Sequence, residues 1–244
     1  MGNIFNNILV HPLLNILVFF YNYIPDIGAV IILLTILVRL LLLPSFHKSM
    51  RHQRELQKLQ PKMKEIREKY KNDQEQQAKA MMELYKVHKV NPLSSCLPIL
   101  IQLPLLFALY RVFIQSLNGQ ALQGLYSFVH NPGNIDPFFL NWINLAAHQN
   151  YILAGAAAIL QFVQTRMMQN QKKDQSSNSN DTLDATNKMM MSYMMYFLPA
   201  MTFFFGVQFP AGLSLYWITT TLFGIAQQHY ILRKEAQEVL YGKQ

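Results

Sequence analysis

The chain alternates between long apolar runs and one strongly polar block. A membrane-crossing helix needs about 20 mostly apolar residues to cover a hydrocarbon core about 30 Å thick. Five segments of the sequence meet this requirement, at about residues 27–46, 93–114, 150–168, 192–209 and 211–232. Only a short stretch around Pro210 separates the last two, which predicts a tight helical hairpin. The pattern therefore predicts an all-α membrane protein with five transmembrane helices.

The segment before the first span, residues 1–25, has a different pattern. Its apolar residues recur at helical spacing, while Asn7, His11 and Asn15 mark the opposite face. The apolar positions are Ile4, Phe5, Ile8, Leu9, Leu13, Ile16, Leu17 and Phe20. A helix with two such faces prefers to lie in the membrane interface. We predict an interfacial amphipathic helix here, and a sixth span is the alternative.

The polar block at 47–91 carries a further helical pattern. Apolar residues spaced 3, 4, 3 and 4 apart form the heptad seam of two packed helices, at Leu56, Leu59, Met63, Ile66 and Tyr70. Pro61 should kink the first helix. Asp73 and Gln76 resemble a capping box that opens a return helix, whose matching stripe is Ala78, Met81 or Met82, and Tyr85. The block therefore predicts a coiled-coil-like helical hairpin.

The charges of the chain are placed asymmetrically around these spans. Of the 21 Lys and Arg residues, most lie in three segments: 12 in 46–91, four in 166–188 and three in 233–243. None lies in 1–38, 112–149 or 206–232. Basic residues mark cytoplasmic loops, so we predict the N-terminus outside, and the hairpin, a flexible loop at 169–188 and a short tail at 233–244 inside. Five spans preserve this alternation, whereas six would break it.

Arg39 is the most informative single residue, because it lies inside the first predicted span. It is about seven residues, or roughly 10 Å, from the inner end, and a charge at that depth costs at least about 2.5 kcal/mol. Thr35 lies one turn away, and no Asp or Glu falls within any predicted span. We therefore favour a water-filled cavity around Arg39; the alternative is that its side chain snorkels to the inner headgroups.

Several other polar or amphipathic residues also fall within predicted spans. They are Gln102, Gln161, Gln164, Tyr216, Trp217, Thr219 to Thr221, Gln227 and Gln228. For any one of these polar groups, hydrogen bonding between helices is the simpler interpretation. Signatures of hydrolases and nucleotide-binding loops are missing from the sequence. We therefore expect no enzyme activity, cofactor or metal, and the single cysteine, Cys96, excludes an intramolecular disulfide.

Four stretches together resemble the YidC/Oxa/Alb family of membrane insertases. The first is the span from Gly28 to Arg39, and the second combines Gln60-Pro61-Lys62-Met63 with Leu84-Tyr85-Lys86 and Val90-Asn91-Pro92. The others are Cys96-Leu97-Pro98-Ile99-Leu100-Ile101-Gln102-Leu103-Pro104 and Phe209-Pro210-Ala211-Gly212-Leu213-Ser214-Leu215-Tyr216-Trp217. The match runs in order from about residue 12 to 234. Its topology agrees with the one that the charges predict.

The resemblance implies an insertase and chaperone that works without nucleotide hydrolysis. Family members have a hydrophilic groove open to cytoplasm and lipid, in which the matching arginine is Arg39; Gln164 and Trp217 match other groove positions. We add Thr35, Gln102, Gln161 and Tyr216 as candidate groove residues. Clients would be nascent or completed membrane proteins, which leave the groove for the bilayer along the third and fifth spans.

The resemblance also implies a location and partners. A bacterial inner membrane fits best, with the lipid bilayer as a partner and no specific nucleic acid. A ribosome and a Sec-type channel stay open as further partners. From another functional class, a small transporter or channel is the alternative, and it would need a continuous path across the bilayer.

Overall fold

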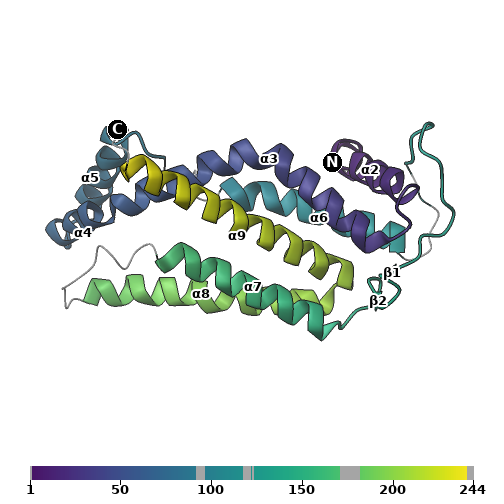
Figure 1. The fold of residues 1–244 in the computed structure, drawn as a ribbon. Coiled ribbons are helices and arrows are strands. Elements are labelled where there is room, and N and C mark those ends of the chain that lie inside the picture. The colour runs from purple at the N-terminus through teal and green to yellow at the C-terminus, as the bar shows by residue number, and fades with distance from the viewer. Residues whose placement is uncertain (1, 92–96, 118–121, 123, 171–181, 241–244) are drawn as a thin grey trace. The chain divides into compact units, whose positions relative to one another are not determined.

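The computed structural model describes residues 2–91, 97–117, 122, 124–170 and 182–240. It is almost entirely helical (Figure 1), as the sequence predicted. Its elements are α1 (Gly2–Phe5), the π-helical turn η1 (Asn6–Val10), α2 (His11–Tyr21), α3 (Ile27–Lys58), α4 (Gln60–Lys69), α5 (Gln74–Val87), α6 (Leu97–Leu117), β1 (Phe138–Phe139), β2 (Ile143–Asn144), α7 (Tyr151–Asn170), α8 (Thr182–Gln208) and α9 (Ala211–Leu240). The sequence pattern did not predict the two short strands, β1 and β2.

The chain divides into two compact units, which we describe separately. The first unit takes in the chain up to Arg39 and again from Phe107, so it holds the N-terminal helices, the two strands and α7 to α9. The second unit is Leu40–Leu106, which holds α4 and α5. Helices α3 and α6 each run from one unit into the other.

One helix of the described chain is long and apolar enough to cross a membrane by length and composition. It is the part of α3 from Ile27 to His52, in which an 18-residue stretch has a mean hydropathy of 2.6. Shorter apolar stretches are Asn6–Tyr21, Leu100–Ser116 and Met195–Gln208. Helices α7 and α9 are long, but their glutamines and threonines lower the mean hydropathy. The count of five spans stays a prediction.

The N-terminal helices bury one side and leave another exposed. The buried side chains of η1 and α2 include Val10, Leu13, Leu14, Leu17 and Val18. Asn15, which the pattern placed on the polar face, is also buried, at 3% exposure. Its amide nitrogen donates to the carbonyls of His11 and Gly124, and its oxygen accepts from the N–H of Tyr126. This face of α2 therefore binds the loop that precedes α7.

The long loop before α7 is fixed to the first unit by further polar contacts. Asn22 donates to the carbonyl of His130 at 2.8 Å, and the hydroxyl of Tyr21 accepts from the N–H of Asp136 at 2.9 Å. Strands β1 and β2 then form a short antiparallel hairpin, with Phe138 paired to Asn144. The loop from Gly124 onward is thus fixed at several points although it has little regular structure.

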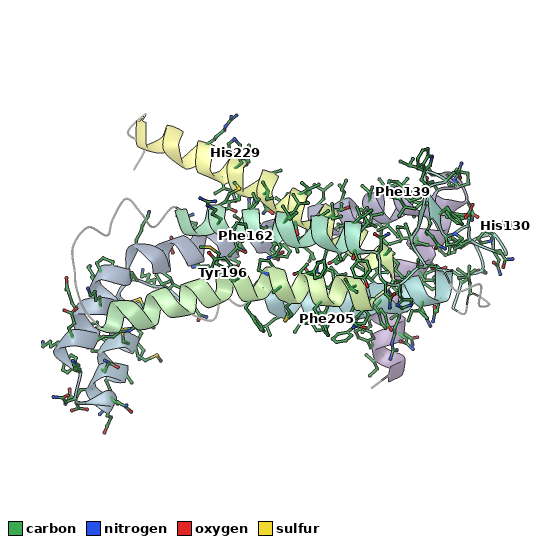
Figure 2. The ribbon with its side chains drawn as sticks, turned by 90° about the horizontal axis from the view of Figure 1, so that it is seen from below. His130, Phe139, Phe162, Tyr196, Phe205 and His229 are labelled. Atoms are coloured by element: carbon green, nitrogen blue, oxygen red, sulfur yellow. The ribbon has the colours of Figure 1, made fainter. Side chains whose placement is uncertain are left out.

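Helices α7, α8 and α9 pack closely because small residues lie between them (Figure 1). Ala154 and Ala157 of α7 are fully buried. A Cβ added at Gly206 of α8 would lie 2.9 Å from the Cβ of Ala154, which leaves no room for a larger residue. Figure 2 shows Phe162 of α7 facing Tyr196 of α8, with ring centroids 6.0 Å apart. Backbones that approach closely through small residues are typical of helix packing in membranes.

The turn between α8 and α9 receives backbone hydrogen bonds from the loop before α7. The carbonyls of Ala147 and Leu145 accept from the N–H groups of Ala211 and Gly212, each at 2.9 Å. The N–H of Gln149 donates to the carbonyl of Val207 at 3.0 Å. Helix ends carry backbone groups that have no partner inside their own helix. Here the loop supplies those partners for the end of α8 and the start of α9.

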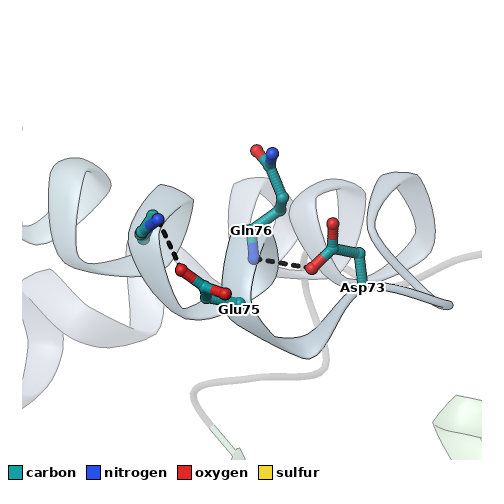
Figure 3. Close-up of polar contacts among 4 residues, drawn as sticks. Asp73, Glu75 and Gln76 are labelled. Atoms are coloured by element: carbon teal, nitrogen blue, oxygen red, sulfur yellow. Dashed lines mark hydrogen bonds and ion pairs between the residues drawn. The ribbon is translucent and has the colours of Figure 1, made fainter.

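In the second unit, the segment predicted as a hairpin forms helices α4 and α5. Leu59 is buried at the break between α3 and α4, and Pro61 follows within the first turn of α4. Asp73 caps α5 by accepting a hydrogen bond from the N–H of Gln76 at 3.0 Å (Figure 3). This half of the predicted capping box is confirmed. The N–H of Asp73 itself donates to the carbonyl of Tyr70.

Three helices extend beyond their predicted bounds. Helix α3 passes position 46 and continues to Lys58 with Pro44 inside it. Helix α8 begins at Thr182, so the end of the predicted 169–188 loop is helical. Helix α9 passes position 232 and continues to Leu240, so much of the predicted tail at 233–244 is helical. Helical residues with few apolar side chains carry a weak periodic signal, which explains these differences. Residues 171–181 of that loop and 241–244 of the predicted tail lie outside the described residues.

Candidate functional site

A hydrogen bond between α3 and α9 defines the candidate site. The Nε of Arg39 donates to the Oγ1 of Thr220. Arg39 is half-buried at the end of the first unit's part of α3, and Thr220 is buried in α9, at 5% exposure. A guanidinium has five N–H donors in a rigid fork, so one threonine satisfies only part of its capacity. The Arg39 guanidinium is therefore the centre of the site, and its remaining N–H donors can bind further polar groups.

Tyr216 and Thr35 each lie one helical turn before these two residues. Tyr216 is fully buried, and it is within electrostatic range of Arg39. Thr35 is buried too, but its hydroxyl donates to the carbonyl of Ile31 in its own helix, at 2.6 Å. Spacing by four residues places each pair on one face of its helix. These faces of α3 and α9 therefore bring four polar groups together.

Helix α9 continues this polar character along its length. Thr219 and Thr221 are buried beside Thr220, and the hydroxyl of Thr219 donates to the carbonyl of Leu215 at 2.9 Å. Gln227 and Gln228 are buried nearer its C-terminal end, at 8% and 3% exposure. Within the described structure, the Nε2 of Gln227 has no hydrogen-bond partner. Buried amides without a partner are costly, so this end of α9 is suited to contact with water.

Helix α7 brings Gln161 and Gln164 to the same part of the first unit. Gln164 lies against Gly224 of α9, where an added Cβ would be 2.3 Å from the Nε2 of Gln164. Gln161 is half-buried one turn earlier, and its carbonyl accepts from the hydroxyl of Thr165 at 2.8 Å. The absence of a side chain at Gly224 therefore lets a polar α7 residue approach α9.

The remaining two candidate residues differ in their surroundings. Trp217 is half-buried on α9, next to Tyr216. Gln102 is half-buried on α6 in the second unit, so its position is described with that unit alone. The structure thus brings Arg39, Thr35 and Tyr216 together, and places Gln161 and Gln164 on the neighbouring helix. Across the described residues, no group of three or more His, Cys, Asp or Glu side chains is placed to hold a metal.

A family model described as 60Kd inner membrane protein matches residues 19–238, which is most of the chain. The chain belongs to this family. The match includes α3 to α8 and all of α9 up to position 238, and so covers the whole candidate site. A location in a membrane agrees with the family's description and with the apolar length of α3.

Curated relatives of this 60Kd family member carry the name membrane protein insertase YidC. The relative from Geobacter sulfurreducens is 38% identical over 230 residues, which is 92% of this chain and 37% of the relative. The relative from Campylobacter jejuni is 36% identical over 230 residues, covering 94% of this chain and 38% of its own length. The chain thus spans a little over a third of the length of these relatives.

A solved structure supports the fold of this 60Kd family member. The crystal structure of an active YidC insertase with its first transmembrane domain resolved matches with a TM-score of 0.56 and 29% sequence identity. The match covers 86% of this chain and 43% of the solved one. The helical arrangement described above is therefore one that an active insertase also has.

Sequence analysis did not single out Thr220 as the partner of Arg39. It named Thr219 to Thr221 as a group, and three adjacent threonines point in three directions around a helix. Which of them faces α3 depends on how α9 is rotated, and one sequence does not give that rotation. A signal was available in the spacing of Tyr216, Thr220 and Gly224, which share one face of α9.

Proposed function

We propose that this protein is a membrane protein insertase and chaperone that moves client transmembrane segments from the cytoplasm into the lipid bilayer. Transfer takes place through a hydrophilic groove and needs no nucleotide hydrolysis. The relatives' name supports the activity. The observation that carries the proposal is the Arg39–Thr220 hydrogen bond, which holds a guanidinium of α3 against the buried threonines of α9.

The physical basis of transfer is a lower barrier for polar client segments. A client helix gains free energy when its apolar surface leaves water for lipid. Its polar flank must pass through an apolar region first, where an unsatisfied polar group costs several kcal/mol. Hydroxyl, amide and guanidinium groups along the path offset part of that cost. The groove proposed here is lined by Arg39, Thr35, Gln161, Gln164, Tyr216 and Trp217 of the first unit.

The charge of Arg39 gives the groove a preference among clients. Acidic client segments are attracted to a guanidinium in surroundings of low dielectric constant, where the attraction is stronger than in water. The hydrogen bond to Thr220 holds the guanidinium on the α9 side. The client then moves sideways into lipid along α7 and α9. We expect acidic outer segments to benefit most.

The orientation of the protein follows from its charges. Lys and Arg are missing from 1–38, 112–149 and 206–232, and 12 of them lie in 46–91. Five spans with the N-terminus outside and the C-terminus in the cytoplasm of a bacterial cell satisfy this pattern. The hydrogen bonds from the 145–149 loop to the α8–α9 turn support a groove that is closed at the outer end.

Membrane-protein clients and the lipid bilayer are the partners that this function requires. The hairpin at 47–91 carries an excess of basic residues, which favours anionic headgroups or ribosomal RNA as its neighbours. A ribosome and a Sec-type channel are therefore reasonable further partners.

The proposal is tested by depleting the endogenous insertase of a bacterial cell and supplying this chain or its variants. The measurement is protease protection of a small single-span client with either an acidic or a neutral outer segment. Arg39→Ala should lower insertion of the acidic client by about ten-fold, the effect of roughly 1.4 kcal/mol, and that of the neutral client less. Arg39→Lys should retain much of the activity, because a point charge is enough for attraction.

The matched control is Arg111→Ala. Arg111 is exposed, contacts Asn6 and the ring of Phe5, and takes no part in the Arg39 cluster. It should insert both clients normally. Equal insertion of acidic and neutral clients by Arg39→Ala would refute the electrostatic preference, and no rescue by the unchanged chain would refute the insertase function itself.

A further inference from the structure

The β1–β2 hairpin carries exposed apolar side chains on a turn that is strained. Leu140 and Asn141 form its centre, with φ of +50° and +59°, and the N–H of Trp142 donates to the carbonyl of Phe139 at 3.0 Å. Two central residues with positive φ suit Asn and Gly. Leucine with positive φ is uncommon and unfavourable. Leu140 is therefore unfavourable for the turn itself, which indicates that its side chain has a role outside the turn.

The tip of this hairpin exposes large apolar surfaces. Trp142 is 88% exposed and Leu140 is 65% exposed, and Phe138 beside them is 41% exposed. The nearby connection between α2 and α3 adds Tyr23 and Ile24, which are also exposed. Exposed apolar groups gathered in one place mark a site of contact with a protein or a membrane.

The hairpin is fixed firmly to the start of α3. The Oδ2 of Asp26 accepts from the N–H of Leu140 at 2.8 Å, while its Oδ1 accepts from the N–H of Ala29 at 2.9 Å. The ring of Phe139 covers Gly28 so closely that an added Cβ would lie 2.2 Å from it. Phe139 is labelled in Figure 2. The tip therefore has a set distance from the beginning of α3.

Because the tip is bound to the start of α3, it lies at the boundary of the membrane that α3 crosses. The apolar part of α3 begins at Ile27 and ends at about position 46, a length of about 30 Å at the helical rise, which matches the thickness of a hydrocarbon core. The residue next to Ile27 binds the turn directly. Tryptophan is the side chain that favours the headgroup level, because its ring is apolar and its N–H is polar.

We propose that the tip of the β1–β2 hairpin inserts Leu140 and Trp142 into the outer headgroup layer of the bilayer and so fixes the depth of α3. The partner is a lipid surface and not a protein, because the exposed side chains of the tip lie at the depth of the lipid headgroups. Attachment does not depend on lipid charge, since residues 112–149 contain no Lys or Arg. The inference rests on α3 crossing a membrane, and it is independent of the groove.

The two tryptophans of the chain make this testable by fluorescence. Trp217→Phe leaves Trp142 as the reporter in the full chain, reconstituted in phosphatidylcholine vesicles. We expect blue-shifted emission, strong quenching by lipids brominated near the headgroup end of the acyl chain, and several-fold weaker quenching by aqueous iodide than for free tryptophan. Replacing part of the lipid with anionic phosphatidylglycerol should leave the emission wavelength and the quenching by brominated lipid unchanged.

A second variant separates the membrane role from a role in folding. Leu140→Gly suits the positive φ of the turn, so the turn itself should form at least as well, but the apolar tip is lost. In the Trp217→Phe background it should reduce lipid quenching and increase iodide quenching several-fold. In the matched Trp142→Phe background, the emission of Trp217 should not change, which shows that the rest of the fold is intact.

Two results would overturn the proposal. Emission at the wavelength of free tryptophan with full iodide quenching would place the tip in water. Protection from both iodide and brominated lipid would show that protein covers it, either a second copy or another segment. Neither result depends on insertase activity. The experiment therefore tests membrane insertion of the β1–β2 hairpin tip separately from the function of the groove.

Discussion

Arg39 and Thr220 connect α3 to α9 through a hydrogen bond. Arg39 and Thr35 could be singled out because a charge and a hydroxyl one turn apart stand out in an apolar run. Thr220 could not be distinguished from its neighbours, although it accepts the Arg39 hydrogen bond. Asn15 was placed on a polar face but is buried in three hydrogen bonds with backbone groups. The sequence identifies polar residues that stand out in apolar segments. Their hydrogen-bond partners depend on how the helices pack, which one sequence does not give.

The role of Thr220 gives a prediction at this scale. Thr220→Val keeps the shape of the side chain but removes the oxygen that accepts from Arg39, so a buried donor loses a partner. Loss of a hydrogen bond to a charged group is worth about 1.5–3 kcal/mol, and we expect insertion of acidic clients to fall by about ten-fold or more. Thr220→Ser should restore it. The depletion and protease-protection assay measures both variants.

The neighbouring threonine provides the control. The hydroxyl of Thr219 donates to the carbonyl of Leu215 in its own helix. Thr219→Val should therefore change insertion little. If Thr219→Val and Thr220→Val are equally damaging, the effect comes from polarity of the helix in general and not from the Arg39 contact.

At the scale of elements, the helices could be predicted and the loop contacts could not. Spans and seams leave a periodic pattern because one face of each helix is apolar. The loop between α6 and α7 binds α2 and the α8–α9 turn mostly through backbone groups, such as the carbonyl of Ala147 and the N–H of Gln149. Backbone groups are the same in every residue, so the sequence carries no signal for them. The β1–β2 hairpin was missed for the same reason.

The cap of α5 gives a prediction for an element. Asp73→Ala removes the side-chain oxygen that accepts from the N–H of Gln76, and loss of such a cap costs about 1 kcal/mol. Amides in the first turns of α5 should therefore exchange with solvent about five-fold faster. Hydrogen exchange of the full chain, followed by mass spectrometry, measures this for the 74–87 peptide.

A surface ion pair on the same helix is the control for this measurement. Glu75 and Lys79 are 2.6 Å apart (Figure 3), but both side chains are more than 70% exposed. Exposed pairs contribute little, so Glu75→Gln should leave exchange nearly unchanged. Exchange of Asp73→Ala at the rate of the unchanged chain would mean that packing against α4, and not the cap, holds the start of α5.

For the whole molecule, the distribution of charge predicts the topology. We expect a cysteine in place of Asp73 to react with a membrane-impermeant reagent only from the cytoplasm, and one in place of Asn131 only from outside. Both are introduced with Cys96→Ser, because that is the single cysteine of the chain. Labelling in intact cells and in inverted vesicles distinguishes the sides. Reaction of the Asp73 position in intact cells would exclude the five-span arrangement.

The hydrogen bonds between the 145–149 loop and the α8–α9 turn also set an order of events during synthesis. The ribosome makes the loop and α7 before it makes residues 207–212. The carbonyls of Leu145 and Ala147 are therefore present before the N–H groups of Ala211 and Gly212 that they accept from. Helices α8 and α9 therefore dock onto a 145–149 loop that has already been synthesised. Their docking completes the backbone hydrogen bonds between this loop and the α8–α9 turn. Chains that stop before Ala211 lack this closing step, so release of a truncated chain should be recognised by quality control as an unfinished fold.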